Sequence, residues 1–274
     1  MNNLKIKEIV TKGYITPSKL SGYDYVINPY VGCPHRCMYC YAEFMKRFSN
    51  HDEPWGTFTD VKIRSNSTRP INLQGKNVFL SSVTDCYNPL EEKYRLTRRL
   101  LEQLRFSGAK VTVLTKSELV LRDIDLFQRM PDITVGFSLN STDDVFRQET
   151  EPCASSVLSR LHALKTLHEN NIKTWVHIAP IFPELSDWKS VIKAAAPYTD
   201  RFTFENLKLR AAALHRVLLY ITQMHPDYKE LYQQIYVEKD DSYWQQTRHD
   251  ILAFCQERQI AATVHFSNEE IKDE

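Results

Sequence analysis

From about residue 77 the chain alternates short β-branched runs with longer amphipathic stretches. In chain order these segments are NVFLSS, LEEKYRLTRRLLEQLRF, KVTVLTK, SELVLRDIDLFQRM, DITVGFSLN, SVLSRLHALKTLHENN, KTWVHIAPIF, DWKSVIKAAAP and RFTFENLKL. Strand and helix repeating in this order predict βαβ units that share one parallel sheet. The apolar runs VFL, VTVL, ITVGF and WVHIA lack polar alternation, which is typical of strands covered on both faces.

The same pattern predicts the domain organisation. We expect an α/β fold in which a partial (β/α)6 TIM-type barrel with parallel strands occupies residues 21–208. Its first strand is DYVINPYV, and residues 50–70 form a loop with a short strand at Thr59–Ile63. Residues 1–20 form an N-terminal segment. Residues 209–274 form a mostly helical C-terminal extension packed on the barrel, with a strand-like IAATVHF that adds to a sheet edge.

In such a barrel, chemistry gathers where the strands end. The strand-end segments are Ser82–Asp85, Thr115–Lys116, Ser138–Asn140, Ile178–Pro180 and Glu205–Asn206. The first strand runs directly into three closely spaced cysteines. We therefore expect these cysteines at the same mouth of the barrel.

Charge and hydropathy argue against a membrane partner and against a global attraction to DNA. The chain has 35 Lys and Arg against 34 Asp and Glu, so its net charge of +1 creates no global field toward DNA or anionic lipid. No apolar run has the length of a signal peptide or approaches the roughly 20 residues of a membrane span. We expect a cytoplasmic protein with no membrane partner. Its six cysteines are then not expected to form disulfides, so the three that lie within eight residues indicate a metal site.

The spacing Cys33-x3-Cys37-x2-Cys40 lets one loop wrap an iron–sulfur cube. Four cysteines saturate a [4Fe–4S] cluster, whereas three leave one iron open for another ligand. Zinc is the structural alternative, although it favours a fourth ligand at similar spacing. His35 lies between two of the cysteines, where it is poorly placed to bind the same metal. A chance arrangement of cysteines is the remaining alternative.

Five blocks, in order, resemble the spore photoproduct lyase-like family of the radical S-adenosylmethionine (SAM) superfamily, often labelled DNA repair photolyases. They are NPYVGCPHRCMYCYA, VFLSSVTDCYNPLEEKYRLTRRLLEQL, VTVLTKSELVLRDIDLF, VGFSLNSTDDVFRQETEP and HIAPIFPELSD. The resemblance implies a [4Fe–4S] cluster whose open iron is chelated by SAM. Reductive cleavage of SAM would then give methionine and a 5′-deoxyadenosyl radical that abstracts a hydrogen atom from a substrate. A flavodoxin or ferredoxin-type electron donor is implied as a partner.

The resemblance also implies SAM contacts near the cysteine loop. Tyr39 matches an aromatic residue that packs against adenine, and Tyr41 follows it; core packing is the alternative for both. Thr84 and Asp85 match acceptors of the methionyl ammonium group, although Asp85 also suits a helix N-cap. Lys116 matches a lysine directed at the methionyl carboxylate, where the alternative is a solvated charge.

Further contacts are implied at the later strand ends. Ser138 and Asn140 suit hydrogen bonds to ribose hydroxyls, with turn chemistry as the alternative. Ala179 and Ile181 resemble a small, apolar contact with adenine, and core packing competes with that role.

Ser82 departs from the pattern of the true lyase. By alignment it occupies the position of a cysteine that returns a hydrogen atom to the product radical, and an O–H bond is too strong to replace S–H in that step. Cys86 is a candidate replacement hydrogen donor, although a buried cysteine also packs as a small apolar residue. Cys153 and Cys255 have no partners at metal spacing, so we interpret them as structural.

The chain after Lys208 does not resemble the substrate element of the lyase. It carries a mix of basic and aromatic residues that suits nucleic acid or, more commonly, amphipathic helices packed on the core. The residues are Arg210, His215, Arg216, Tyr220, His225, Tyr243, Trp244 and Arg248. We expect a radical SAM enzyme acting on an unidentified substrate. The alternatives are a nucleic-acid repair or modification enzyme with the same chemistry, and a non-catalytic metal-binding partner of another radical SAM protein.

Overall fold

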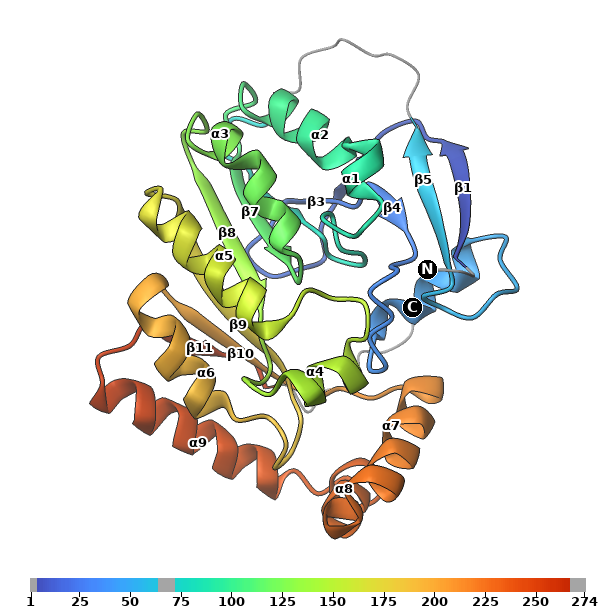
Figure 1. The fold of residues 1–274 in the computed structure, drawn as a ribbon, viewed down its shortest axis with the longest axis vertical. Helices are drawn as coiled ribbons and strands as arrows, with labels where there is room; N and C mark the ends of the chain where they lie inside the picture. The colour runs from blue at the N-terminus through green and yellow to red at the C-terminus, as the bar shows by residue number, and fades with distance from the viewer. Residues whose placement is uncertain (1–3, 64–71, 267–274) are drawn as a thin grey trace.

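A computed structural model describes residues 4–63 and 72–266 of the chain (Figure 1). Its larger sheet has the strand order β11-β10-β9-β8-β7-β6-β3-β2, in which only the edge strand β2 runs antiparallel to its neighbour. The strands are β2 (Ile15–Pro17), β3 (Tyr25–Ile27), β6 (Asn77–Leu80), β7 (Lys110–Thr115), β8 (Ile133–Ser138), β9 (Lys173–Ile181), β10 (Phe202–Asn206) and β11 (Ala262–Val264). Parallel strands β3 and β6 to β10 lie within residues 21–208. The predicted α/β fold with a parallel sheet is confirmed.

Helices follow the strands and cover one side of this sheet (Figure 1). They are α1 (Glu91–Tyr94), α2 (Leu96–Leu104), α3 (Ile124–Phe127), α4 (Asp144–Thr150), α5 (Val157–Glu169) and α6 (Trp188–Ala195). Leu101, Leu164 and Ile192 from three of these helices join strand residues such as Val113 and Val135 in one buried apolar cluster. Apolar burial therefore drives helices and sheet together.

The predicted helix LEEKYRLTRRLLEQLRF is divided into α1 and α2. Arg95, which joins them, adopts a left-handed conformation with φ 52°. The fully buried Glu91 carboxylate accepts the Thr97 N–H at 3.0 Å and the Tyr30 hydroxyl at 2.5 Å. A side chain of α1 thus satisfies the first turn of α2, which stabilises the break.

The predicted first strand DYVINPYV is also divided. β3 joins the larger sheet, whereas β4 (Tyr30–Val31) joins a second sheet with β1 (Lys5–Val10) and β5 (Phe58–Ile63), in the order β1-β5-β4. Pro29 separates the two strands because it has no N–H to continue a ladder. The strand predicted at Thr59–Ile63 is confirmed as β5, and residues 64–70 of the predicted loop lie outside the described residues.

The C-terminal part contains α7 (Ala211–Met224), α8 (Lys229–Tyr236) and α9 (Ser242–Glu257) before β11. β11 pairs in parallel with β10, so the predicted final strand does extend the sheet. The Tyr232 hydroxyl donates to the Pro183 carbonyl at 3.1 Å, and the Tyr236 hydroxyl to the Leu207 carbonyl at 3.0 Å. These bonds fasten α8 to the segments that follow β9 and β10.

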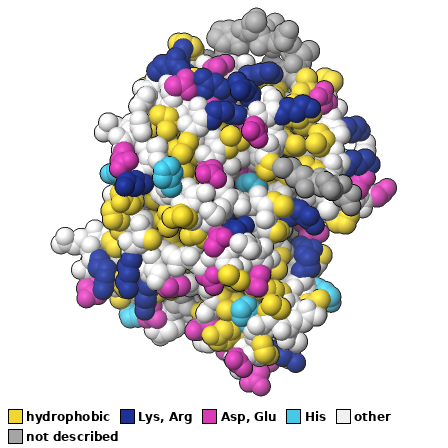
Figure 2. All heavy atoms as spheres, in the orientation of Figure 1, with side chains coloured by type: hydrophobic (Ala, Val, Ile, Leu, Met, Phe, Trp, Pro, Cys, Tyr) yellow, Lys and Arg dark blue, Asp and Glu magenta, His cyan; other side chains and the backbone are white. Residues whose placement is uncertain are grey.

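Basic and aromatic side chains of this part are largely used in packing. Trp244 and Tyr220 are buried, Arg216 pairs with Glu43 at 2.7 Å, and Arg248 donates to the Val264 carbonyl at 2.9 Å. Figure 2 shows Lys and Arg interspersed with Asp and Glu over most of the face in view. Among the described helices, none has the length and hydropathy needed to cross a membrane.

Gly136 on β8 gives room to Trp175 on the neighbouring strand β9. The two residues are register partners, and a Cβ built on Gly136 would overlap the indole ring of Trp175. The indole N–H donates to the Val113 carbonyl on β7 at 3.4 Å, so the ring lies across the strand between them. Only glycine at position 136 leaves space for this ring.

We expect G136A to lower the free energy of unfolding by about 1–3 kcal/mol, because the added methyl overpacks a buried site. Chemical denaturation followed by circular dichroism measures the change. Gly13 is the matched control, since a Cβ there meets no atom within 4 Å, and G13A should stay within about 0.5 kcal/mol of the parent. Equal stabilities of G136A and the parent would contradict the placement of Trp175 across β8.

Candidate active site

The three cysteines lie on the loop between β4 and the 3-10 helix η1 (Tyr41–Phe48). Cys33, Cys37 and Cys40 are half-buried free thiols. The Arg36 N–H donates to the Cys33 carbonyl at 3.4 Å and the Cys40 N–H to the Cys37 carbonyl at 3.2 Å, which makes the loop a pair of tight turns. Gly32 begins it with φ 86°, where a Cβ would overlap the Phe58 carbonyl.

Cys33 lies close enough to the other two thiols to affect the pKa values of Cys37 and Cys40. Burial, together with the nearby Cys33, raises the pKa of Cys40 to about 11. Burial also raises the pKa of Cys37, and the nearby Lys116 cation offsets only part of this rise. Within the described ranges, no group of three His, Cys, Asp or Glu side chains is placed to hold a single metal ion. A cubane does not require such a group, because each of its thiolates binds a different iron. The donor set therefore suits a cluster.

The cysteine loop is fastened to the carboxyl end of the sheet. The Thr84 hydroxyl, after β6, donates to the Gly32 carbonyl at 2.8 Å. The Met38 N–H donates to the Thr150 carbonyl at 2.9 Å, and the Cys153 N–H donates to the His35 carbonyl at 3.2 Å. Backbone bonds thus join the loop to the segment after α4. His35 itself is buried, and its side chain bonds both Asp85 and Cys33.

Asp85 links the loop to two strand ends. Its Oδ1 accepts the Tyr87 N–H at 2.8 Å and the Thr115 hydroxyl at 2.7 Å, and its Oδ2 accepts the Lys116 N–H at 2.8 Å. His35 Nδ1 lies 3.4 Å from the same Oδ2. Burial disfavours the carboxylate, but His35 and these donors lower the pKa of Asp85 to about 2. The carboxylate is therefore charged and largely occupied.

The alternative role of Asp85 as a helix N-cap is wrong. Helix α1 begins at Glu91, and Leu90 holds its N-cap position. Asp85 instead closes a short turn on the Tyr87 N–H, because Asp side chains readily bond backbone two residues ahead.

Tyr39 and Lys116 meet at a buried carboxylate that the sequence analysis did not identify. The Tyr39 hydroxyl donates to Oε1 of the fully buried Glu151, and Lys116 Nζ lies 3.9 Å from the same oxygen. Arg160 Nη2 donates to Glu151 Oε2 at 2.5 Å, and its Nη1 donates to the Ser138 carbonyl at 2.9 Å. The ammonium of Lys116 also stands 5.9 Å above the Tyr39 ring. Two of the predicted site residues are thus positioned by a common ion pair.

Glu151 and Lys116 both stay charged in this buried network. Burial opposes ionisation of Glu151, yet Arg160 and Lys116 lower its pKa. Burial likewise opposes the cation of Lys116, while Glu151 and Cys37 raise its pKa. Lys116 is therefore a cation beside the cysteine loop at neutral pH. Glu151 stands in the quoted block ending in ETEP, but only the fold brings Arg160 to it.

Two amides at the ends of parallel strands carry buried polar atoms without a partner in the described structure. They are Nδ2 of Asn140, just after β8, and Oδ1 of Asn206, at the end of β10. Such atoms are costly unless another group satisfies them. A polar ligand at this edge would do so, and Asn140 is one of the residues predicted to bind ribose. Neighbouring Ser138 instead donates to the Ala179 carbonyl at 3.0 Å.

The remaining predicted residues are placed as follows. Ala179 and Ile181 are buried at the end of β9. Tyr41 is 57% exposed, and its hydroxyl donates to the Ser82 carbonyl. Cys86 is fully buried in the apolar core, Cys153 is exposed and Cys255 is buried.

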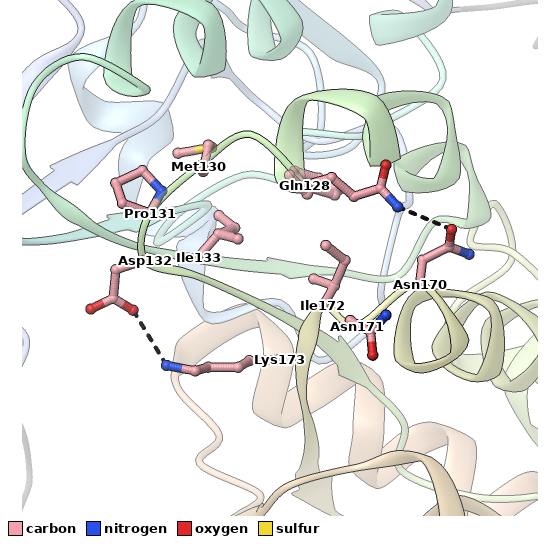
Figure 3. A pocket seen from close by; sticks show the side chains of 10 residues that line it. Gln128, Met130, Pro131, Asp132, Ile133, Asn170, Asn171, Ile172 and Lys173 are labelled. Atoms are coloured by element: carbon pink, nitrogen blue, oxygen red, sulfur yellow. Dashed lines mark hydrogen bonds and ion pairs between the residues drawn. The ribbon is translucent and has the colours of Figure 1, made fainter.

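A hollow of about 380 Å³ lies at the opposite end of the strands (Figure 3). Ile133 and Lys173, the first residues of β8 and β9, line it. Asp132 faces Lys173 across it at 3.8 Å. It is therefore remote from the cysteine loop, and it belongs to the end of the sheet that usually serves stability.

The model of the Radical SAM superfamily matches residues 27–194. An uncharacterized protein of Methanocaldococcus jannaschii is 38% identical over 231 residues, which cover 84% of this chain and 87% of that relative. An uncharacterized protein of Acidianus two-tailed virus is 31% identical over 194 residues, which cover 62% of this chain and 63% of the relative.

Among solved structures, spore photoproduct lyase complexed with dinucleoside spore photoproduct has a TM-score of 0.69 at 16% identity, over 96% of this chain and 82% of the lyase. A mutant of that lyase with bound AdoMet and the dinucleoside has a TM-score of 0.60 at 17% identity, over 80% of this chain and 67% of the lyase. At these identities the likeness shows a shared fold.

We expect E151Q to lower the free energy of unfolding by about 3–5 kcal/mol, because it leaves the buried Arg160 cation without its counter-charge. E169Q is the control: Glu169 pairs with Lys165 at 3.7 Å on an exposed helix face, and its loss should cost below about 0.5 kcal/mol. Urea denaturation of both variants measures the difference. Similar small losses in the two would contradict the buried ion pair.

Proposed function

The chain belongs to the radical SAM superfamily and is a radical SAM enzyme, and on this premise we propose that Cys33, Cys37 and Cys40 hold one [4Fe–4S] cluster beside a SAM site. When bound and reduced by an external donor, the cluster would pass one electron to SAM and break its sulfonium C–S bond, which would give methionine and a 5′-deoxyadenosyl radical able to take a hydrogen atom from a substrate. The observation that carries the proposal is the joining of a three-cysteine loop to strand ends that bear unpartnered polar atoms.

Roles follow for the residues around the loop. Lys116 offers a cation to the methionyl carboxylate, and Glu151 keeps that cation in position. The Asn140 amide, which is buried without a partner, suits a ribose oxygen. Tyr39 is held by its bond to Glu151 with its ring beside Lys116. For Tyr39 we retain the role of an adenine contact.

The two residues predicted to accept the methionyl ammonium group, Thr84 and Asp85, receive different roles. The Thr84 hydroxyl donates to Gly32 and still has acceptor capacity, so we retain its contact with the methionyl ammonium. Asp85 is largely occupied by bonds to the protein, and we assign it to holding the loop. At the remaining strand ends we propose Ser138, Ala179 and Ile181 as neighbours of the nucleoside. Tyr41 lies at the rim, on the solvent side of the loop.

Radical SAM enzymes need an electron donor, and we propose a flavodoxin or ferredoxin-type protein in this role. The shared fold favours the chemistry of spore photoproduct lyase, but Ser82 supplies no thiol for its return step. Cys86 is fully buried in the apolar core, which favours packing over hydrogen donation. The packed aromatic residues of the C-terminal part favour a structural role over nucleic-acid binding.

Anaerobic reconstitution tests the ligands. We expect about four irons and four sulfides per chain in the parent, and 5′-deoxyadenosine from SAM under dithionite. C37A should lose the cluster absorbance. C153A removes an exposed thiol and should retain the cluster absorbance. Zinc in the anaerobic protein with no 5′-deoxyadenosine would contradict the proposal, as would an unchanged spectrum in C37A.

Loss of the Asn140 amide should weaken SAM binding. We expect N140A to raise the Kd for SAM about two- to tenfold, the effect of one hydrogen bond, because the amide nitrogen has no described protein partner. Equilibrium dialysis on the reconstituted protein measures the Kd. N170A alters an amide that bonds Gln128 at the far end of the sheet and should leave the Kd unchanged. An unchanged Kd in N140A would refute this contact.

A further inference from the structure

The Cys40 sulfur receives a side-chain hydrogen bond from outside the cysteine loop. Trp55 Nε1 lies 3.2 Å from Cys40 Sγ and donates to it. The backbone N–H of Ala42 also bonds this thiol. Trp55 is half-buried, so its N–H is partly shielded from water. One of the three proposed ligands therefore has two N–H donors directed at its sulfur.

The segment that carries Trp55 is fixed by a stack of rings. Trp55 packs edge-on against Phe58, with ring centroids 5.7 Å apart and an interplanar angle of 87°. The His51 ring stacks on the Phe58 ring, with ring centroids 4.0 Å apart. His51 Nε2 contacts Asp60 at 2.8 Å, and its Nδ1 contacts Glu53 at 2.9 Å. The indole is therefore positioned by the second sheet, through the start of β5.

Gly56 brings this segment against the cysteine loop. It has φ 86°, and a Cβ there would lie 3.0 Å from Arg36 Cγ, which is part of the cysteine loop. The adjoining residue is Trp55. Close approach of the two segments at Gly56 thus sets the distance between the indole and Cys40.

A hydrogen bond to a cluster sulfur affects reduction. The reduced cluster carries one more negative charge than the oxidised cluster, so an N–H donor stabilises the reduced form more strongly. Groups that bond to metal ligands tune the metal in this way.

We propose that Trp55 is a positioning residue that raises the reduction potential of the cluster through its bond to Cys40. The proposal rests on the proposed function, since it needs the cluster there. It gives the second sheet a role: the ring stack of His51, Phe58 and Trp55 fixes a donor on a cluster ligand. An easier reduction of the cluster then lessens the demand on the electron donor.

W55F tests the bond, because it keeps an aromatic ring against Phe58 and removes the N–H. In an anaerobic redox titration of the reconstituted protein, followed by EPR, we expect the ratio of reduced to oxidised cluster at fixed potential to fall roughly three- to tenfold. Tenfold corresponds to a shift of about 59 mV to more negative potential. W188F is the matched control, since Trp188 packs against Phe254 on α9. The reduction potential of the cluster in W188F should equal that in the parent.

A second measurement leaves the parent sequence intact. Pulsed EPR of the reduced protein with 15N-labelled tryptophan should show a 15N coupling to the cluster that is absent in W55F. One exchangeable-proton coupling should also be lost in W55F, while that of the Ala42 N–H remains. Equal potentials in the parent and W55F, or no 15N coupling in the parent, would overturn this inference while the cluster itself stands. Failure of the parent to assemble a cluster would overturn the proposed function instead.

Discussion

The Asp85 carboxylate connects three parts of the molecule that must meet for the site to exist. It accepts the Lys116 N–H and the Thr115 hydroxyl at the end of β7, and it lies 3.4 Å from His35 in the cysteine loop. A buried carboxylate is costly unless all its neighbours favour the charge. Asp85 follows β6, and these neighbours come from β7 and the cysteine loop. The charged carboxylate is therefore stable only when all three parts are assembled.

A second buried carboxylate extends this arrangement. Glu151 joins Tyr39 of the loop to Lys116 and Arg160, and Arg160 in turn bonds the end of β8 through the Ser138 carbonyl. Asp85 therefore sets the distance of the loop from the sheet, and Glu151 fixes the side chains that face the proposed cofactor. The site is positioned by charge pairs that cross between elements, on a sheet that apolar burial holds together.

Periodicity and motif spacing predicted the parallel sheet and the position of the cysteine loop, because strand alternation and turn residues are local signals. They did not predict the division at Pro29, which sends β4 to a second sheet, or the partners of Asp85. Glu151 contacts Arg160, and Trp55 contacts Cys40. Such contacts join segments that are separate in the sequence, so they leave no periodic signal. Composition left two roles open for the basic and aromatic residues near the C-terminus, nucleic-acid binding and core packing. The buried Trp244 and the paired Arg216 favour packing.

The central claim is that three cysteines hold a cubane with one iron open to SAM. Mössbauer spectroscopy of the 57Fe-reconstituted protein tests it most directly, because it resolves irons by their coordination. The account predicts four irons in a cubane, of which one changes its isomer shift when SAM is added while three stay unchanged. Four equivalent irons whose spectrum is unaffected by SAM would contradict the account.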